Sequence, residues 1–280
     1  MSTPAPTLTL PNGVQMPRLG LGTWPMDDAQ ATTAIAQAID LGYRLIDTAE
    51  NYENERGVGA GIKASGIDRS EIFLTTKFNR KWHSIDGVRQ ALEASLDRLG
   101  LDYVDLFLVH WPNPDQGRHV EAVEGLLKVM DDGLIRSFGT SNYKPAHLAA
   151  LFERGIVPHV NQIQLDPYHP RRDLIALHRE KGIVTEAWSP LDRPTGSPTD
   201  LVNDPAVLTL ADKYGRSGSQ IVLRWHVQND FVPSPKSSDP TRQAENLAVF
   251  DFELTPEEMV SLEFDKPAGD EFLDADTFGH

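Results

Sequence analysis

The chain has 280 residues, of which 40% are hydrophobic and 24% charged, a composition that supports a folded core and excludes a disordered chain. Its formal net charge of −15 argues against nucleic acid and anionic membranes as partners, because both require a basic surface. The absence of cysteine excludes disulfides, thiol catalysis and thiolate metal sites. Residues 1–6 do not resemble a secretory signal, and no apolar stretch approaches the ~20 residues that span a bilayer, so we expect a cytoplasmic protein.

Short β-type runs alternate with helix-periodic stretches along the chain. An Asn12-Gly13 turn between residues 8–10 and 14–15 predicts a β-hairpin ahead of the first repeat. The expected strands that follow are 45–47, 72–77, 104–110, 135–140, 160–165 and 184–187. The expected helices are 29–41, 56–65, 85–99, 119–132, 145–154 and 171–181. Proline directly after Asp239 and after Thr255 marks two further helix starts.

Strands that alternate with helices predict a parallel sheet, either doubly wound or closed into a barrel. The barrel is favoured because about eight repeats are found if residues 19–21 open the set and residues 231–232 close it. We therefore expect an α/β fold, a (β/α)₈ TIM barrel with an N-terminal β-hairpin cap, as a single domain over residues 1–280. The hairpin would precede the barrel and could close its bottom.

Polar residues stand at the ends of successive expected strands. Asp47, Lys77 and His110 end the second, third and fourth strands, and the same trend continues at Ser141-Asn142, Gln162, Trp188-Ser189 and Lys236. In a (β/α)₈ barrel these ends meet at one mouth. A buried lysine is costly unless it is paired, which makes Asp47 the natural partner of Lys77. Taken alone, such a pair could be structural and His110 could be a core histidine; the functional interpretation depends on their convergence with Tyr52, which follows the second strand.

These side chains suit the reduction of a carbonyl group, which needs a proton donor at its oxygen as hydride arrives. Tyrosine has an ordinary pKa of about 10, too high for an efficient acid near neutrality. A Lys77 cation would lower the pKa of Tyr52 by favouring the phenolate, and Asp47 would hold that lysine in place. His110 could donate a hydrogen bond to the carbonyl oxygen and orient the substrate. This chemistry needs no metal, and we expect none.

The stretch Gly42-Tyr43-Arg44-Leu45-Ile46-Asp47-Thr48-Ala49, followed by Tyr52 and residues 55–59, resembles the signature of the aldo-keto reductase superfamily. The resemblance spans nearly the whole chain and is greatest for the prokaryotic 2,5-diketo-D-gluconate reductase branch. Further stretches agree with it, at Thr76-Lys77, residues 105–112, residues 139–142, Asn161-Gln162, and Pro235-Lys236-Ser237 with Arg242, Glu245 and Asn246.

The resemblance implies an NADPH-dependent, monomeric enzyme that reduces aldehydes and ketones, with small-molecule carbonyl compounds as its substrates. It implies a catalytic tetrad of Asp47, Tyr52, Lys77 and His110. It also implies a substrate site at Trp24, Tyr52, His110 and Trp111. The cofactor would lie against Thr23, Trp24, Asp47, Ser141, Asn142, Gln162, Trp188, Ser189, Leu191, Lys236, Ser237, Arg242, Glu245 and Asn246. Within this set, Lys236, Ser237 and Arg242 near a helix N-terminus form an anion site for the 2′-phosphate, which favours NADPH over NADH.

Three positions depart from the pattern of the superfamily. Ser234 replaces the usual aliphatic residue, and the strand end could be bent by Pro233 and Pro235. Asp239 lies beside the expected phosphate site, either as an innocuous helix N-cap or facing the phosphate and weakening the preference for NADP. Trp82 stands further from Lys77 than the aromatic residue of many relatives and could simply pack. The basic residues near the rim, which could favour carboxylated substrates or be solvated surface, are Arg80, Lys81 and Arg118.

Two other functions compete with carbonyl reduction. Lys77 could be the nucleophile of a Schiff-base aldolase or isomerase, since barrels host such lysines. Pairing with Asp47 opposes this, because it keeps the amine protonated. The barrel could also be a cofactor-binding sensor or a structural protein without turnover, a hypothesis that intact Tyr52 and Lys77 oppose.

Overall fold

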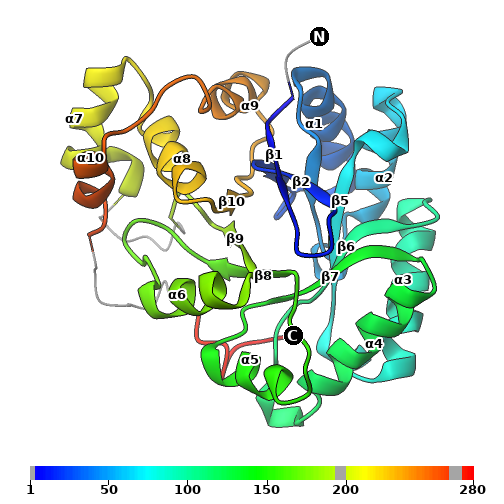
Figure 1. Cartoon of the computed structure of the whole chain (residues 1–280). Coiled ribbons are helices and arrows are strands. Elements are labelled where there is room, and N and C mark those ends of the chain that lie inside the picture. Colours follow the sequence, from blue (N-terminus) through cyan, green and yellow to red (C-terminus); the bar gives the residue numbers. More distant parts are fainter. Residues whose placement is uncertain (1–3, 193–199, 265–272) are drawn as a thin grey trace.

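Eight parallel strands form one sheet that curls into a barrel (Figure 1), and the computed structural model describes residues 4–192, 200–264 and 273–280 of the chain. In the order of the sheet the strands are β10 (Val232–Pro233), β9 (Val184–Trp188), β8 (Val160–Gln164), β7 (Ile135–Ser141), β6 (Val104–Val109), β5 (Phe73–Phe78), β4 (Leu45–Asp47) and β3 (Gly20–Gly22). The two edges of the sheet meet where Gly22 forms a parallel bridge with Lys236. A hydrogen bond of 3.2 Å from the Gly22 amide to the Pro235 carbonyl supports that junction. The prediction of a barrel is confirmed, and an open doubly wound sheet is excluded.

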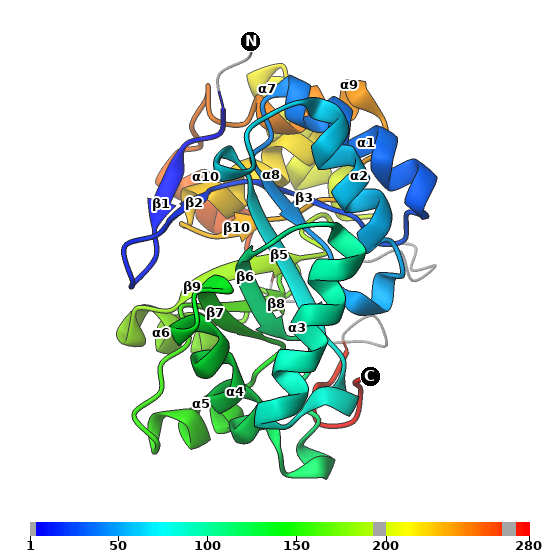
Figure 2. The ribbon, with the colours of Figure 1, turned by 90° about the vertical axis from the view of Figure 1, so that its right-hand side faces the viewer.

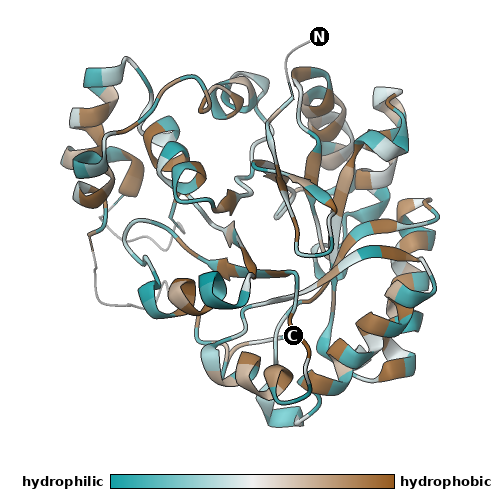
Figure 3. Ribbon diagram, viewed as in Figure 1, coloured by the Kyte–Doolittle hydropathy of each residue, from teal (hydrophilic) through white to brown (hydrophobic). Residues whose placement is uncertain are grey.

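Helices surround the barrel and connect its strands (Figure 1). In chain order they are α1 (Asp28–Leu41), α2 (Glu55–Ser65), α3 (Ile85–Leu99), α4 (His119–Asp131), α5 (Pro145–Phe152), α6 (Arg172–Lys181), α7 (Pro205–Tyr214), α8 (Gly218–Gln228), α9 (Pro240–Leu247) and α10 (Pro256–Ser261). Each carries both hydrophobic and hydrophilic residues (Figure 3), as expected for a helix that covers a sheet on one side and meets water on the other. Among the described residues, no helix has the length and apolar character needed to cross a membrane.

Local sequence signals explain where the helices begin and end. The Ser84 hydroxyl caps α3 by accepting a hydrogen bond from the Gly87 amide, and Gly100 ends that helix in the left-handed conformation with a φ of 67°. Helices α7 and α8 were absent from the expected elements, although their start signals are present. Asp204 caps α7 directly before a proline, and Ser217 forms a capping box with Gln220 at the start of α8.

The N-terminal hairpin closes one end of the barrel. Its strands, β1 (Thr7–Thr9) and β2 (Gln15–Pro17), pair antiparallel as predicted. Leu10 and Met16 are fully buried, and they pack into one cluster with the residues that begin several barrel strands: Leu45, Phe73, Val160 and Val232. Figure 2 shows the hairpin and the C-terminal segment on opposite sides of the strands. The strand beginnings are therefore sealed by apolar contacts, and the strand ends are left for polar side chains.

Alternation along the strands decides which side chains face the barrel interior. On β4, Leu45 packs towards the hairpin and Asp47 lies two residues nearer the opposite mouth. On β9 the interior positions are Val184, near the hairpin, then Glu186 and Trp188. Every second residue of these strands faces the interior, and these interior side chains change from apolar near the hairpin to polar near the mouth.

The Met16→Ala variant tests the contribution of the hairpin to stability. We expect it to lower the free energy of unfolding by about 2–5 kcal/mol, because it opens a cavity in a fully buried apolar cluster. The control Thr9→Ala removes an exposed side chain of the same hairpin and should change stability by less than about 0.5 kcal/mol. Urea unfolding of both variants measures the difference, and equal small losses would show that the hairpin does not seal the barrel.

Candidate active site

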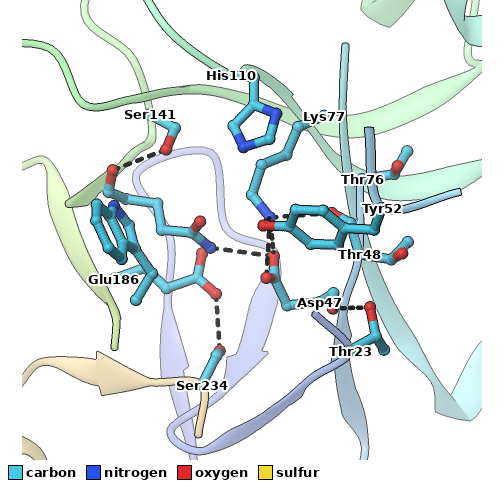
Figure 4. Close-up of polar contacts among 12 residues, drawn as sticks. Thr23, Asp47, Thr48, Tyr52, Thr76, Lys77, His110, Ser141, Glu186 and Ser234 are labelled. Carbon is cyan, nitrogen blue, oxygen red and sulfur yellow. Dashed lines mark hydrogen bonds and ion pairs between the residues drawn. The ribbon is translucent and has the colours of Figure 1, made fainter. Parts of the chain in front are cut away.

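The side chains predicted at the strand ends meet at the mouth opposite the hairpin. Asp47 ends β4, Lys77 lies in β5 and His110 directly follows β6. Asp47 is paired in register with Thr75 of β5, which places Lys77 two residues further along on the same face. Figure 4 shows Asp47, Lys77, Tyr52 and His110 grouped around one point. The structure therefore brings together all four residues of the predicted tetrad.

A buried ion pair forms the base of this group. Lys77 is fully buried, and its Nζ lies 2.8 and 2.9 Å from the two carboxylate oxygens of Asp47. The Thr48 carbonyl accepts another hydrogen bond from Nζ at 2.9 Å. Burial alone would lower the pKa of Lys77, but the adjacent Asp47 carboxylate outweighs it and the pKa lies above its ordinary value. The lysine is therefore held as a cation.

Tyr52 stands above this pair, at the end of a short 3₁₀ segment, Glu50–Tyr52, that follows β4. Lys77 Nζ donates to its hydroxyl at 3.3 Å and lies 5.0 Å from the centre of its ring. The ring of His110 meets the ring of Tyr52 edge-on, with 5.8 Å between the centres. The phenol oxygen is thus placed between a fixed cation and an imidazole.

The protonation states of Tyr52 and His110 follow from burial and from Lys77. Burial raises the pKa of Tyr52, and Lys77 acts in the opposite direction without reversing the shift. Lys77 does lower the pKa of Tyr52, as expected. The expectation of a lowered pKa overall is wrong, because desolvation raises the pKa by more than Lys77 lowers it. Burial, with Lys77 second, holds the pKa of His110 well below its usual range, so its imidazole is neutral.

Amide and hydroxyl groups on β7, β8 and β9 form a connected set beside the ion pair. The Trp188 Nε1 donates to Asn142 Oδ1 at 2.8 Å, and Asn142 Nδ2 donates to Ser141 Oγ at 3.1 Å. Ser141 Oγ donates to the Gln162 carbonyl at 3.0 Å, and Gln162 Nε2 donates to Asp47 Oδ1 at 3.1 Å. The orientation of the Trp188 ring is therefore linked to the ion pair.

The remaining predicted cofactor residues lie around the same mouth and beyond β10. Thr23 donates to the Asp47 carbonyl at 3.0 Å, and Ser189 and Leu191, just after β9, are half-buried. Lys236 is exposed in the segment before α9 and Arg242 in the first turn of that helix, Ser237 and Asn246 are buried, and Glu245 is exposed. In the described parts of the chain, neither Lys236 nor Arg242 has an acidic partner.

Asp239 is the N-cap of α9. Its carboxylate accepts hydrogen bonds from the Thr241 and Arg242 amides at 2.8 and 3.2 Å. The predicted N-cap position is confirmed, since the carboxylate is turned onto the helix backbone.

Aromatic side chains form the outer wall of the mouth. Trp111 is only 4% exposed and packs edge-on against Phe278, with 4.8 Å between the ring centres. The His280 ring lies 5.1 Å from that of His110. Trp24 is 58% exposed at the end of β3. Phe278 and His280 were not among the predicted site residues. Their contacts join segments far apart in the chain, and no local sequence pattern indicates such contacts.

Trp82 and the rim cations have structural partners. The Trp82 indole donates to both carboxylate oxygens of Glu50, at 3.1 and 3.0 Å, and its ring packs against the core. The ion pairs at the rim are Arg80 with Asp115, Lys81 with Glu50, and Arg118 with Glu121. For Trp82 the geometry supports a packing role. For the three basic residues it supports paired surface charge.

Ser234 and Glu186 are two interior polar residues whose importance sequence reasoning did not identify. Ser234 is buried just after β10, where its hydroxyl donates to the Glu186 carboxylate at 3.0 Å. The serine that departs from the superfamily pattern therefore serves a buried acid, rather than only marking a bend between two prolines. The alternation Val184, Glu186, Trp188 on one strand is the signal that could have placed Glu186 inside the barrel.

Comparisons with known proteins agree with this geometry. A family model described as "Aldo/keto reductase family" matches residues 18–263. Morphine 6-dehydrogenase of Pseudomonas putida is 44% identical over 272 residues, covering 94% of this chain and 92% of that protein. The 2,5-diketo-D-gluconic acid reductase B of Corynebacterium sp. is 44% identical over 258 residues, covering 92% of each. The crystal structure of a Bombyx mori aldo-keto reductase in complex with NADP superposes with a TM-score of 0.89, at 36% identity and over 95% of this chain and 94% of that one. The chain belongs to the aldo/keto reductase family.

Proposed function

We propose that this enzyme reduces aldehydes and ketones to alcohols with NADPH, and that Tyr52 is the general acid. The observation that carries the proposal is the contact of 3.3 Å between the Tyr52 hydroxyl and the buried Lys77 cation, which Asp47 fixes in place. NADPH, when bound, supplies the hydride that attacks the carbonyl carbon. The residues of this chain supply the proton and stabilise the charge that develops on the oxygen.

Proton transfer from Tyr52 suits the electrostatics of the site. The raised pKa means that the phenol is protonated at neutral pH but is a weaker acid than free tyrosine, so donation depends on stabilising the phenolate as the carbonyl oxygen takes the proton. As the proton leaves, negative charge appears on the phenol oxygen beside Lys77, where a fixed cation stabilises it. The neutral His110 imidazole can donate a hydrogen bond to the same carbonyl oxygen, and Tyr52 recovers its proton from solvent.

The residues around the mouth fit a nicotinamide dinucleotide phosphate. Ser141, Asn142 and Gln162 offer amide and hydroxyl groups for the carboxamide, and the half-buried Trp188 presents a ring for stacking. Lys236, in the segment before α9, and Arg242, in the first turn of α9, have no acidic partner among the described residues, and the helix dipole at this end favours an anion. The NADP bound to the Bombyx mori relative supports the same assignment. The proposed cofactor contacts are those given in the sequence analysis, Thr23, Trp24, Ser189, Leu191, Ser237, Glu245 and Asn246 included.

The aromatic wall favours flat or apolar carbonyl compounds as substrates, held against Trp24 and Trp111. One relative is named a dehydrogenase, of morphine, and another a reductase, of 2,5-diketo-D-gluconic acid, and these names support use of the site in either direction. A Schiff-base mechanism at Lys77 is disfavoured, because Asp47 keeps that amine protonated. We further propose that the chain acts as a cytoplasmic, monomeric protein with one barrel domain.

The Tyr52→Phe variant tests the proton donor. We expect carbonyl reduction to fall by about 100-fold or more, because the acid is lost, while the Kd for NADPH stays within about threefold. Tyr103→Phe, which removes a hydroxyl from a tyrosine outside the mouth, serves as the control and should keep full activity. NADPH oxidation with a panel of carbonyl compounds measures the effect. A Tyr52→Phe enzyme with more than about a tenth of the original rate contradicts the assignment.

The Lys236→Ala variant tests the choice of cofactor. We expect the Kd for NADPH to rise about tenfold or more, since a charge-assisted contact to the 2′-phosphate contributes roughly 1.5–3 kcal/mol, while the Kd for NADH changes less than about twofold. Lys63→Ala, at an exposed lysine on α2, is the matched control. Fluorescence titration measures both constants. Equal weakening of the two cofactors would show that Lys236 does not bind the 2′-phosphate.

A further inference from the structure

Glu186 is a buried acid that the proposed proton transfer leaves without a role. It lies in the middle of β9, is fully buried and faces the barrel interior one step below Trp188. One carboxylate oxygen accepts the hydrogen bond from Ser234, and the other, Oε2, has no hydrogen-bond partner in the described residues. Leaving a buried polar atom unpaired is costly, and such a group calls for an explanation beyond packing.

The neighbours of Glu186 connect it to the ion pair of the tetrad. Gln162 is its direct partner in register on β8, and the Gln162 amide donates to Asp47 at 3.1 Å. Figure 4 shows the Glu186 carboxyl group between Ser234 and Asp47, on the side of Asp47 away from Tyr52. Within the described part of the barrel interior, the Lys77 cation therefore lies near two carboxyl groups, those of Asp47 and Glu186.

We propose that Glu186 is a positioning residue of the proton-donor site: anchored by Ser234 and adjoining Gln162, it acts on Asp47 and Lys77 from below and helps to keep the proton on Tyr52 as the pH rises. The inference rests on the proposed role of Tyr52 as the general acid. It assigns to Ser234, the position that departs from the superfamily pattern, the task of holding this acid.

The electrostatics of the interior agree with this role. Burial, and then the Asp47 carboxylate, raise the pKa of Glu186 to about 8, while the Lys77 cation, the nearby Gln162 amide and the hydrogen bond from Ser234 act in the opposite direction. The titratable groups that face it are Asp47 on β4, Lys77 on β5 and Tyr52 after β4, with the neutral His110 behind Lys77; β8 and β10 contribute Gln162 and Ser234, which do not titrate. An ionised Glu186 raises the pKa of Tyr52 and of Lys77.

The sign of the pH effect follows from these directions. Below about pH 8 Glu186 carries its proton and is neutral, so its replacement by glutamine changes little. Above that pH its negative charge disfavours the phenolate and keeps the proton on Tyr52. Reduction needs that proton, so the rate falls at the alkaline pH where Tyr52 loses it. Removing the charge of Glu186 should therefore bring this alkaline decline to lower pH.

The pH profile of kcat/KM for carbonyl reduction by Glu186→Gln tests the inference. We expect the alkaline decline of kcat/KM to move to lower pH by about 0.5 unit or more. Ser234→Ala should move it in the same direction by less, because it removes a hydrogen bond that favours the ionised acid. Glu55→Gln is the control: this glutamate is equally buried but is paired with Arg98 and Thr76 outside the barrel, and its loss should leave the decline in place.

A second measurement does not depend on turnover. In protein labelled with ¹³C at the glutamate carboxyl groups, one resonance should titrate near pH 8 and disappear in Glu186→Gln. A Glu186 resonance that titrates near the ordinary value of about 4.3, or an alkaline decline that stays within about 0.2 unit in both variants, overturns the inference. If Tyr52→Phe still reduces carbonyl compounds, the proposed function itself has failed; if Tyr52→Phe is inactive and the decline does not move, only the role of Glu186 has failed.

Discussion

A lysine ammonium with no exposure to solvent is the constraint around which the mouth of this barrel is organised. Burying such a charge is costly, and leaving it without its partner would cost about 3–5 kcal/mol. Asp47 meets that requirement through two contacts shorter than 3 Å, and Gln162 and the Thr48 carbonyl complete the surroundings. The contacts that offset the cost of burying the lysine charge also fix its position beneath the Tyr52 hydroxyl. Stability and chemistry therefore depend on one geometry, and a change to the pair affects both.

The barrel separates what stabilises the fold from what performs the reaction. At the hairpin end, Leu10 and Met16 seal an apolar floor formed by the first residues of the strands. Towards the other end the interior positions become polar, through Glu186 and Gln162 to Asp47 and Lys77, and finally reach the aromatic wall. The charged layer lies between an apolar floor and the mouth, where little water reaches it, so each charge acts strongly on its neighbours. On this ground we propose that a carboxyl group as deep as Glu186 acts on Tyr52.

The sequence was informative wherever a local rule applied. The Asn-Gly turn predicted the hairpin, short β-type runs predicted six of the barrel strands and allowed for two more, and polar strand ends identified Asp47, Lys77 and His110 with Tyr52 beside them. Helices α7 and α8 were missed although Asp204-Pro205 and the Ser217 capping box mark their starts. The net direction of the Tyr52 pKa could not be obtained, because it depends on how far burial outweighs the Lys77 cation. The contacts of Phe278 and His280, and the link from Ser234 to Glu186, join distant segments and become visible only in three dimensions.

The central claim is that the Lys77 cation makes Tyr52 an effective proton donor. The most direct test is the single-turnover rate of NADPH oxidation by Lys77→Met, measured by stopped flow with a carbonyl substrate after circular dichroism has established that the variant is folded. We predict a rate at least about 100-fold lower, with the Kd for NADPH within about threefold, because the loss falls on proton transfer rather than on cofactor binding. A folded Lys77→Met enzyme that oxidises bound NADPH within about fivefold of the original rate would contradict the account.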